Sequence, residues 1–155
     1  ITFTDEAIGL TETCDQIVPD FDAPKYKAQS DHQTDTVYLV HCTLDFSDDF
    51  SFTSEADNTL NLNDDNDAYH FVVLMQDNLK DDMTQAGLHP ITSDDHGASH
   101  VDGWYGFVAM GDSTQAKPLP EDAMTLSYER GAATGGGDKG DEAHASRSKV
   151  TVKNG

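Results

Sequence analysis

The apolar run at residues 69–75 is the longest in the sequence, and it constrains the fold more than any other segment. It is too short to span a membrane, and its β-branched and aromatic side chains disfavour a helix. Because apolar residues occupy both alternating positions, the run predicts a strand that is buried on both faces near the centre of a sheet. Acidic and amide residues at 63–67 and 76–78 flank it on either side. The chain therefore combines short apolar strands with a strongly acidic surface.

Alternation of apolar and polar residues predicts further strands along the chain. The clearest is residues 36–46, and Phe50 and Phe52 after the next turn suggest its hairpin partner. One short helix is expected at residues 78–87, where Leu79 and Met83 have helical spacing. The other expected strands are 1–10, 60–62, 103–111, 123–130 and 149–153, and the expected loops are 18–30, 88–102 and the glycine-rich segment 131–147.

These seven or eight short strands predict an all-β protein, an antiparallel β-sandwich with long acidic loops and at most one short helix. A small barrel is the alternative. The 155 residues suffice for a single domain, 1–155, with a sizeable core. Of the 29 acidic residues only six are Glu, and the excess of Asp favours turns over helix interiors.

The formal net charge is −20, because 9 basic residues face 29 acidic ones. A surface this acidic repels nucleic acid and anionic membranes, so neither is an expected partner. The same charge attracts divalent cations, keeps a protein soluble at high salt and suits an extracellular setting. A solvated acidic surface without bound metal is the favoured explanation of the composition, so charge alone predicts no cofactor.

Cys14 and Cys42 are the two cysteines, and they are 42 − 14 = 28 positions apart. In an exported protein an isolated pair predicts one disulfide, which would stabilise the fold by about 3 kcal/mol in the chain-entropy model. Two buried thiols in a cytosolic protein are the alternative. The sequence starts at Ile1 without a hydrophobic targeting segment, so we expect a mature chain whose signal sequence has been removed, although a trimmed chain would look the same. The expected location is extracellular or at the cell surface.

Three histidines lie among aspartates in the polar segment from His89 to Asp102. Imidazole supplemented by carboxylate suits zinc or copper, so His89, His96 and His100 are candidate metal ligands. His96 and His100 would share one face of a helix, but Gly97 between them favours a loop. An exposed polar loop with scattered histidines is the alternative interpretation.

The acidic run at residues 61–67 is the second candidate metal site. Asp64, Asp65 and Asp67 offer the hard oxygen ligands that calcium prefers. The run is not an EF-hand, because the glycine of the sharp turn and the closing glutamate are missing. Calcium or another divalent metal is therefore the cofactor class these residues suggest, and a solvated acidic turn is the alternative.

Asp112 and Ser113 follow a glycine after an apolar strand, and Asp141 and His144 have an Asp-x-x-His spacing. In these two fragments the chain resembles the catalytic blocks of the SGNH esterases. The resemblance would imply a three-layer α/β domain, and the short segment between the two blocks contains no helices to build one. The chain also lacks a Gly-x-Ser-x-Gly motif. No enzyme and no catalytic residue is therefore predicted.

The first functional hypothesis is an exported structural or assembly protein, a subunit of a filament, pilus-like fibre or surface layer that forms a homo-oligomer or polymer. Ile1, Phe3 and Ile8 of the first strand would join the sheet of a neighbouring subunit. The alternative is a monomeric extracellular binding module for a divalent metal or a carbohydrate, using the histidine segment, the acidic run or the aromatic strand around Trp104. A third hypothesis is a copper or redox protein that uses the histidine segment.

Overall fold

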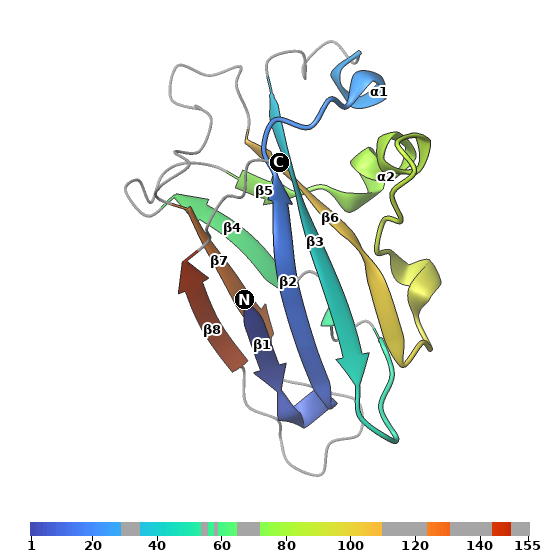
Figure 1. The fold of residues 1–155 in the computed structure, drawn as a ribbon, viewed down its shortest axis with the longest axis vertical. Helices are drawn as coiled ribbons and strands as arrows, with labels where there is room; N and C mark the ends of the chain where they lie inside the picture. Colours follow the sequence, from blue (N-terminus) through green and yellow to red (C-terminus); the bar gives the residue numbers. More distant parts are fainter. Residues whose placement is uncertain are drawn as a thin grey trace.

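The computed structural model describes residues 1–28, 35–53, 56–57, 59–64, 72–109, 124–130 and 144–149. Every strand in these residues belongs to one of two antiparallel sheets (Figure 1). The larger sheet has five strands in the order β1-β2-β3-β6-β5, and the smaller has three in the order β4-β7-β8. The described chain is therefore mostly β, as the strand pattern predicted. No helix of the described residues is long and apolar enough to cross a membrane.

The larger sheet consists of β1 (Thr2–Asp5), β2 (Leu10–Val18), β3 (Thr36–Phe46), β6 (His100–Ala109) and β5 (Val72–Leu74). The smaller sheet consists of β4 (Leu60–Asp64), β7 (Met124–Arg130) and β8 (His144–Lys149). The helices are α1 (Pro24–Lys27) and α2 (Gln76–Gln85), and two 3₁₀ turns are η1 (Glu6–Ile8) and η3 (Ser93–Asp95).

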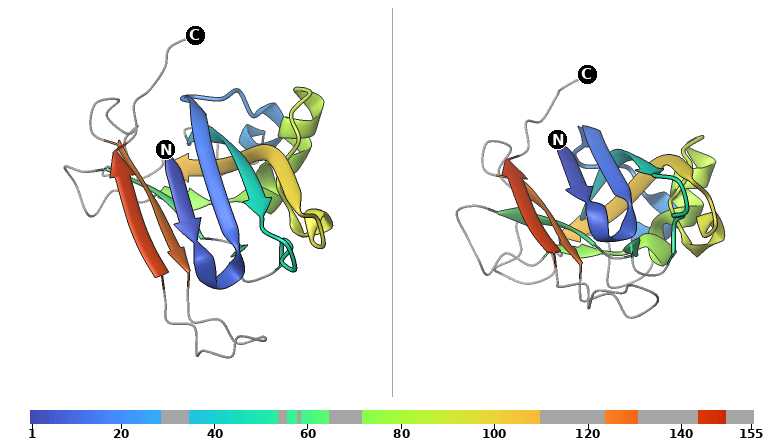
Figure 2. Two further views of the ribbon diagram at one scale, coloured as in Figure 1. Left: turned by 60° about the horizontal axis from the view of Figure 1, so that its bottom comes forward. Right: turned by 90° about the horizontal axis from the view of Figure 1, so that it is seen from below.

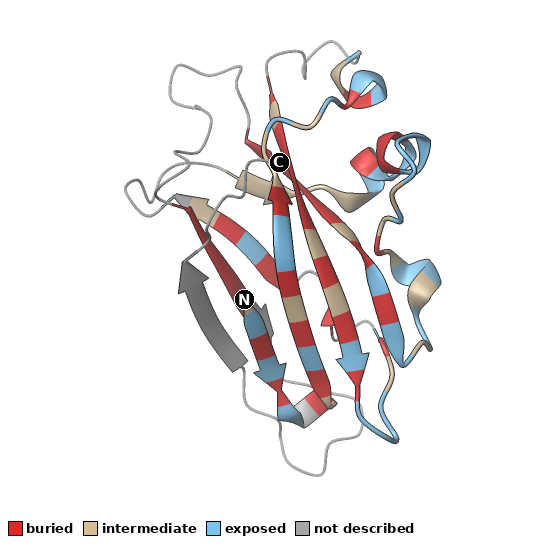
Figure 3. Cartoon of the chain, in the orientation of Figure 1, coloured by how far each residue is buried: buried red, intermediate tan, exposed pale blue. Residues whose placement is uncertain are grey.

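The principal core contains residues of both sheets, among them Leu44 of β3 and Leu126 of β7. Successive residues of a strand point to opposite faces, so buried and exposed residues alternate along β1 and β2 (Figure 3). Phe3 stacks on Tyr128 across the two sheets, with ring centroids 5.8 Å apart. The Tyr128 hydroxyl donates a buried hydrogen bond of 2.7 Å to Asp5. Aromatic stacking and a buried hydrogen bond thus connect the two sheets across the core.

A second, smaller core lies on the outer face of the larger sheet. There α1 and α2 cover the side of the sheet away from β7 and β8 (Figure 2). Tyr26 of α1 and Leu79 of α2 belong to this core together with Leu39 and Val108 of the sheet. Gly106 gives Leu79 its room, because a Cβ at that position would lie 2.5 Å from Leu79 Cδ1. The helices therefore bury one part of this sheet face.

The single turn of α1 is capped by a side chain of α2. The Asp82 carboxylate accepts hydrogen bonds from the backbone N–H groups of Lys25 and Tyr26, each at 3.0 Å. Ala23, at the N-cap position of α1, has no side chain that could satisfy these donors. The prediction of a loop at residues 18–30, and hence of at most one helix, was wrong because Asp82 supplies the cap from a distant part of the chain.

The apolar run at residues 69–75 does not form the centre of the sheet as predicted. Only Val72–Leu74 are in a strand, the half-buried edge strand β5, and residues 69–71 lie outside the described part of the chain. Val72 and Leu74 pack against the principal core and Met75 against the second core, since α2 follows directly. Contact with two cores, rather than a central place, thus explains why the described part of this run is apolar at both parities.

Other boundaries also differ from the sequence prediction. Phe52 is in no strand, and its N–H donates to the carbonyl of Ala98 at 2.9 Å, so the expected hairpin does not form. The strand expected at 103–111 begins earlier, at His100, within the predicted loop. Strand β8 lies partly within the segment expected to be irregular, and residues 150–153 are outside the described residues.

Candidate functional site

A small pocket opens where β5 passes into α2, beside the segment that precedes β6. Its volume is about 150 Å³. The walls combine apolar side chains with two carboxylates, two aliphatic hydroxyls, an amide and a phenol. The lining residues are Phe52, Asp57, Leu74, Gln76, Asp77, Ile91, Thr92, Ser93 and Tyr105.

Gln76 fixes one wall of the pocket to the sheet. Its Nε2 donates to the carbonyls of Ile91 at 2.8 Å and Trp104 at 2.6 Å, and its Oε1 accepts from the N–H of Gly106 at 2.8 Å. All three partners are backbone groups, so the amide joins β6 to the segment beside it. Gln76 therefore positions the pocket, and little of its hydrogen-bonding capacity is left for a ligand.

A capped 3₁₀ turn forms another part of the wall. Thr92 Oγ1 accepts from the N–H of Asp94 at 3.2 Å, and the Asp95 carboxylate accepts from the N–H of Thr92 at 3.1 Å. This reciprocal pair is a capping box, which satisfies donors at the start of η3. The turn holds Thr92 and Ser93 at the pocket.

Two aspartates, Asp57 and Asp77, line the pocket. Asp57 is bound by Nε2 of His96 at 3.0 Å, and the His96 ring packs edge-on against Phe52 with centroids 5.0 Å apart. Asp77 is exposed in the first turn of α2, where a carboxylate is also favourable to the helix dipole. Carboxylates from two distant parts of the chain thus belong to the lining of one pocket.

Tyr105 of β6 is buried, and its hydroxyl has no hydrogen-bond partner among the described residues. Burial, with a smaller contribution from the charges of Glu12 and Asp57, raises the pKa of the Tyr105 phenol well above its ordinary value. The phenol is therefore neutral, and Tyr105 is one of the residues that line the pocket. An unpaired buried hydroxyl costs about 1–3 kcal/mol.

Within the part of the chain that the structure describes, the predicted metal ligands do not form one cluster. His89, His96 and His100 contact different carboxylates, those of Asp95 at 2.9 Å, Asp57 at 3.0 Å and Asp45 at 2.6 Å. In the acidic run, Asp64 is the last residue of β4, while Asp65 and Asp67 are outside the described residues. Metal binding by either segment stays a prediction.

His41 was not predicted as a site residue, and it lies on the outer face of the larger sheet. Its Nδ1 contacts Asp15 at 2.6 Å and its Nε2 contacts Asp102 at 2.7 Å, with Trp104 at a ring distance of 5.1 Å. Burial lowers the pKa of His41, but hydrogen bonds and charge from the two aspartates outweigh it, so the net pKa is raised. The three residues are adjacent only through strand pairing, which a single sequence does not reveal.

The predicted disulfide between Cys14 and Cys42 is present, with the two residues directly opposite each other on β2 and β3. Ile1, Phe3 and Ile8, the residues predicted for strand exchange, are part of the chain's own fold. Phe3 and Ile8 are buried in the principal core and Ile1 packs against it. Exchange of this strand between subunits stays a prediction.

Sequence reasoning did not find Asp57, Asp77 or Gln76, and it treated Tyr105 only as part of an aromatic strand. Their common signal is spatial, because Gln76 and Asp77 begin α2, Tyr105 belongs to β6 and Asp57 lies in the segment before β4. No protein-family model, curated protein or solved structure matches this chain.

Proposed function

We propose that this protein is an exported binding module whose pocket holds a small polyhydroxylated ligand, such as one sugar residue. The observation that carries the proposal is that two carboxylates line the pocket together with Tyr105, a residue whose buried hydroxyl has no hydrogen-bond partner among the described residues. A buried polar group without a partner is rare in a folded protein, and a ligand is one explanation for it. The two sheets would serve as a β-sandwich scaffold that holds the pocket rigid.

The chemistry of the lining favours hydroxyl groups as the ligand's polar atoms. The carboxylates of Asp57 and Asp77 accept hydrogen bonds, and the phenol of Tyr105 can donate one. Phe52, Leu74 and Ile91 offer apolar contact to the C–H faces of a ring. No three metal-ligating side chains of the described residues converge at this pocket, which supports a hydroxylated ligand over a metal ion.

The volume of the pocket and the disulfide of the protein also support a small extracellular ligand. Pockets for drug-sized ligands measure about 300–1,000 Å³, so a volume of about 150 Å³ suits a single ring. The disulfide and the absence of a membrane-spanning helix in the described residues are compatible with an exported protein. The expected class is therefore a non-enzymatic module that recognises a small sugar outside the cell.

The test is a thermal-shift screen of neutral and amino monosaccharides, with calcium as a separate arm. We expect one sugar class to raise the melting temperature saturably, since a ligand at 100 times its Kd stabilises a fold by about 2.7 kcal/mol. Asp77→Asn should abolish the shift, because it removes a carboxylate from the lining of the pocket. Asp94→Asn is the matched control, since Asp94 is exposed and follows Ser93 in the chain but does not line the pocket.

Tyr105→Phe provides the second variant of this test. It should weaken sugar binding while leaving the unliganded protein as stable as the wild type or more so, because the unpaired hydroxyl is gone. The proposal is wrong if no sugar shifts the melting temperature, or if Asp77→Asn and Asp94→Asn behave alike. An increase in melting temperature with calcium alone would instead support metal binding as the function.

Assembly through β1 is the second candidate function, and the position of β1 at the edge of its sheet favours it. Ile1 and Cys14 exchange backbone hydrogen bonds of 3.1 and 2.8 Å. Because hydrogen-bonded and non-hydrogen-bonded pairs alternate along an antiparallel ladder, the N–H groups of Thr2 and Thr4 point away from β2. This edge could therefore accept a strand of a second copy, as in a filament, pilus-like fibre or surface layer.

Thr4→Pro tests the assembly candidate, because it removes an outward N–H without removing a β1–β2 hydrogen bond. If β1 is the contact, the wild type should form large particles by light scattering, and Thr4→Pro should remain a folded monomer. Thr4→Val keeps the N–H and the strand propensity, so it should assemble normally. A wild type that is monomeric at high concentration, or equal assembly by both variants, would exclude this role.

A further inference from the structure

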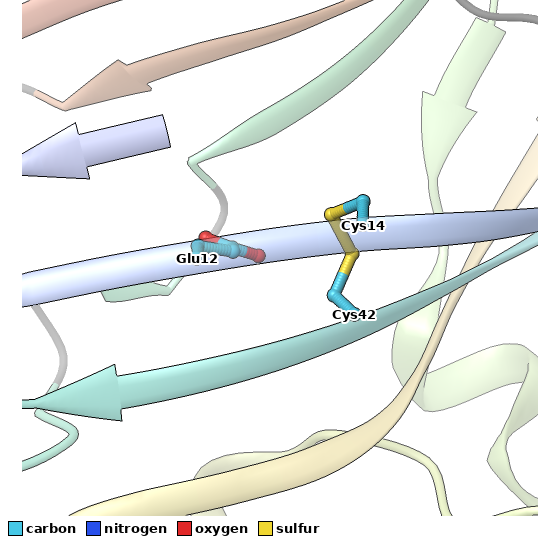
Figure 4. A group of neighbouring side chains, drawn as sticks. All are labelled: Glu12, Cys14 and Cys42. Carbon is cyan, nitrogen blue, oxygen red and sulfur yellow. A yellow bond between two sulfur atoms is a disulfide. The ribbon is translucent and has the colours of Figure 1, made fainter. Parts of the chain in front are cut away.

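A buried carboxyl group lies beside the disulfide in the principal core. Glu12 and Cys14 are both on the inward face of β2, and Cys42 faces them from β3 (Figure 4). The ligand atoms of the three side chains lie within 4.8 Å of one another, and all three residues are buried. Carboxylate and sulfur ligands from two neighbouring strands thus converge on one point.

The fold itself does not account for Glu12. The residue is 0% exposed, and neither carboxylate oxygen has a hydrogen-bond partner among the described residues. An apolar residue of similar size would fill the same place without the desolvation cost, since isolated buried charges are unfavourable. The carboxyl group is therefore an unsatisfied ligand atom set next to two sulfurs.

We propose that reduction of the Cys14–Cys42 disulfide turns this group into an enclosed binding site for a thiophilic divalent cation of the zinc class. A dithiol reductant supplies two electrons and two protons. The S–S bond breaks, two S–H bonds form, and the reductant becomes a cyclic disulfide. The cation then displaces the thiol and carboxyl protons and is bound by two thiolates and one carboxylate.

The ligand set and its spacing favour zinc-like ions over calcium. Thiolate binds zinc and cadmium strongly, whereas calcium takes oxygen ligands only. Around a tetrahedral zinc with bonds of about 2.3 Å to sulfur, two thiolates lie about 3.8 Å apart. Small side-chain rotations reach that separation once the S–S bond is broken. In the oxidised protein the sulfurs are bonded to each other and do not ligate.

Cadmium is the probe, because cadmium thiolates have a charge-transfer absorption in the ultraviolet. The protein is reduced with dithiothreitol, freed of reductant by anaerobic desalting, and titrated with cadmium alone. We expect one cadmium per reduced chain by native mass spectrometry, with thiolate charge-transfer absorption, and no such absorption in the oxidised chain. Glu12→Gln should weaken the Kd at least tenfold. Glu6→Gln, an exposed carboxylate nearby in the chain, should leave it unchanged.

Circular dichroism keeps the test decisive if the reduced chain unfolds. In that case cadmium should restore the folded spectrum of the wild type and of Glu6→Gln at lower concentration than that of Glu12→Gln. Either of two results overturns the proposal. The reduced chain takes up no more cadmium than the oxidised one, or Glu12→Gln binds it as tightly as Glu6→Gln.

Discussion

At the scale of single residues, Glu12 makes stability depend on pH in an unusual direction. Burial raises the pKa of Glu12 from 4.5 to about 8. Between these values the unfolded chain releases the proton and the folded chain keeps it. Stability should therefore fall as pH rises from 4.5 to about 8 and level off above, by on the order of a few kcal/mol, since each pKa unit is worth about 1.4 kcal/mol.

Urea unfolding at a series of pH values measures this effect in the wild type and in Glu12→Gln. The difference in slope between the two isolates Glu12, because the other groups titrate in both. Glu6→Gln should keep the wild-type slope. If Glu12→Gln follows the same pH curve as the wild type, the Glu12 carboxyl does not retain its proton in the folded core.

His41, on the outer face of the larger sheet, also makes the folded state more stable at lower pH. Its raised pKa means that the protonated ring between Asp15 and Asp102 stabilises the folded state fully below the unfolded-state value of 6.5. That contribution is lost as pH rises through the folded-state pKa. Glu12 and His41 thus both make the folded state more stable under mildly acidic conditions.

At the scale of elements, α1 depends on a side chain that is not its own. Asp82→Ala leaves the N–H groups of Lys25 and Tyr26 without their acceptor, so it should destabilise the protein by about 1–2 kcal/mol. Asp81→Ala is the matched control, since its exposed ion pair with Lys25 contributes little. Thermal unfolding measures both variants, and equal melting temperatures would mean that Asp82 does not cap α1.

The same elements explain how far sequence reasoning reached. The strand at 36–46 and the helix near 78–87 were predicted closely, because local periodicity determines them. The cap of α1 comes from 57 positions away, and the contact of His100 with Asp45 spans 55, so neither leaves a local signal. The disulfide was predictable because the chain offers only one pairing, whereas the pocket is assembled from segments with no common motif.

At the scale of the whole molecule, the net charge of −20 should make the fold more stable in salt. Repulsion among surface carboxylates destabilises the compact state, and the Debye length shortens from about 14 Å at 50 mM to about 4 Å at 500 mM sodium chloride. We expect the melting temperature to rise over this range. Calcium chloride at equal ionic strength should match it if screening alone acts. A melting temperature that stays constant or falls would exclude charge repulsion as a major cost.

Two glycines of strand β6, Gly103 and Gly106, lie very close to other segments of the chain. A Cβ at Gly103 would be 2.6 Å from the carbonyl oxygen of His89, just as one at Gly106 would meet Leu79. A methyl group at Gly103 would displace the backbone of the neighbouring segment, whereas one at Gly106 would meet the end of the Leu79 side chain. During divergence from a common ancestor, Gly103 would therefore stay glycine more strictly than Gly106, while Asp102 would change only together with its contact to His41.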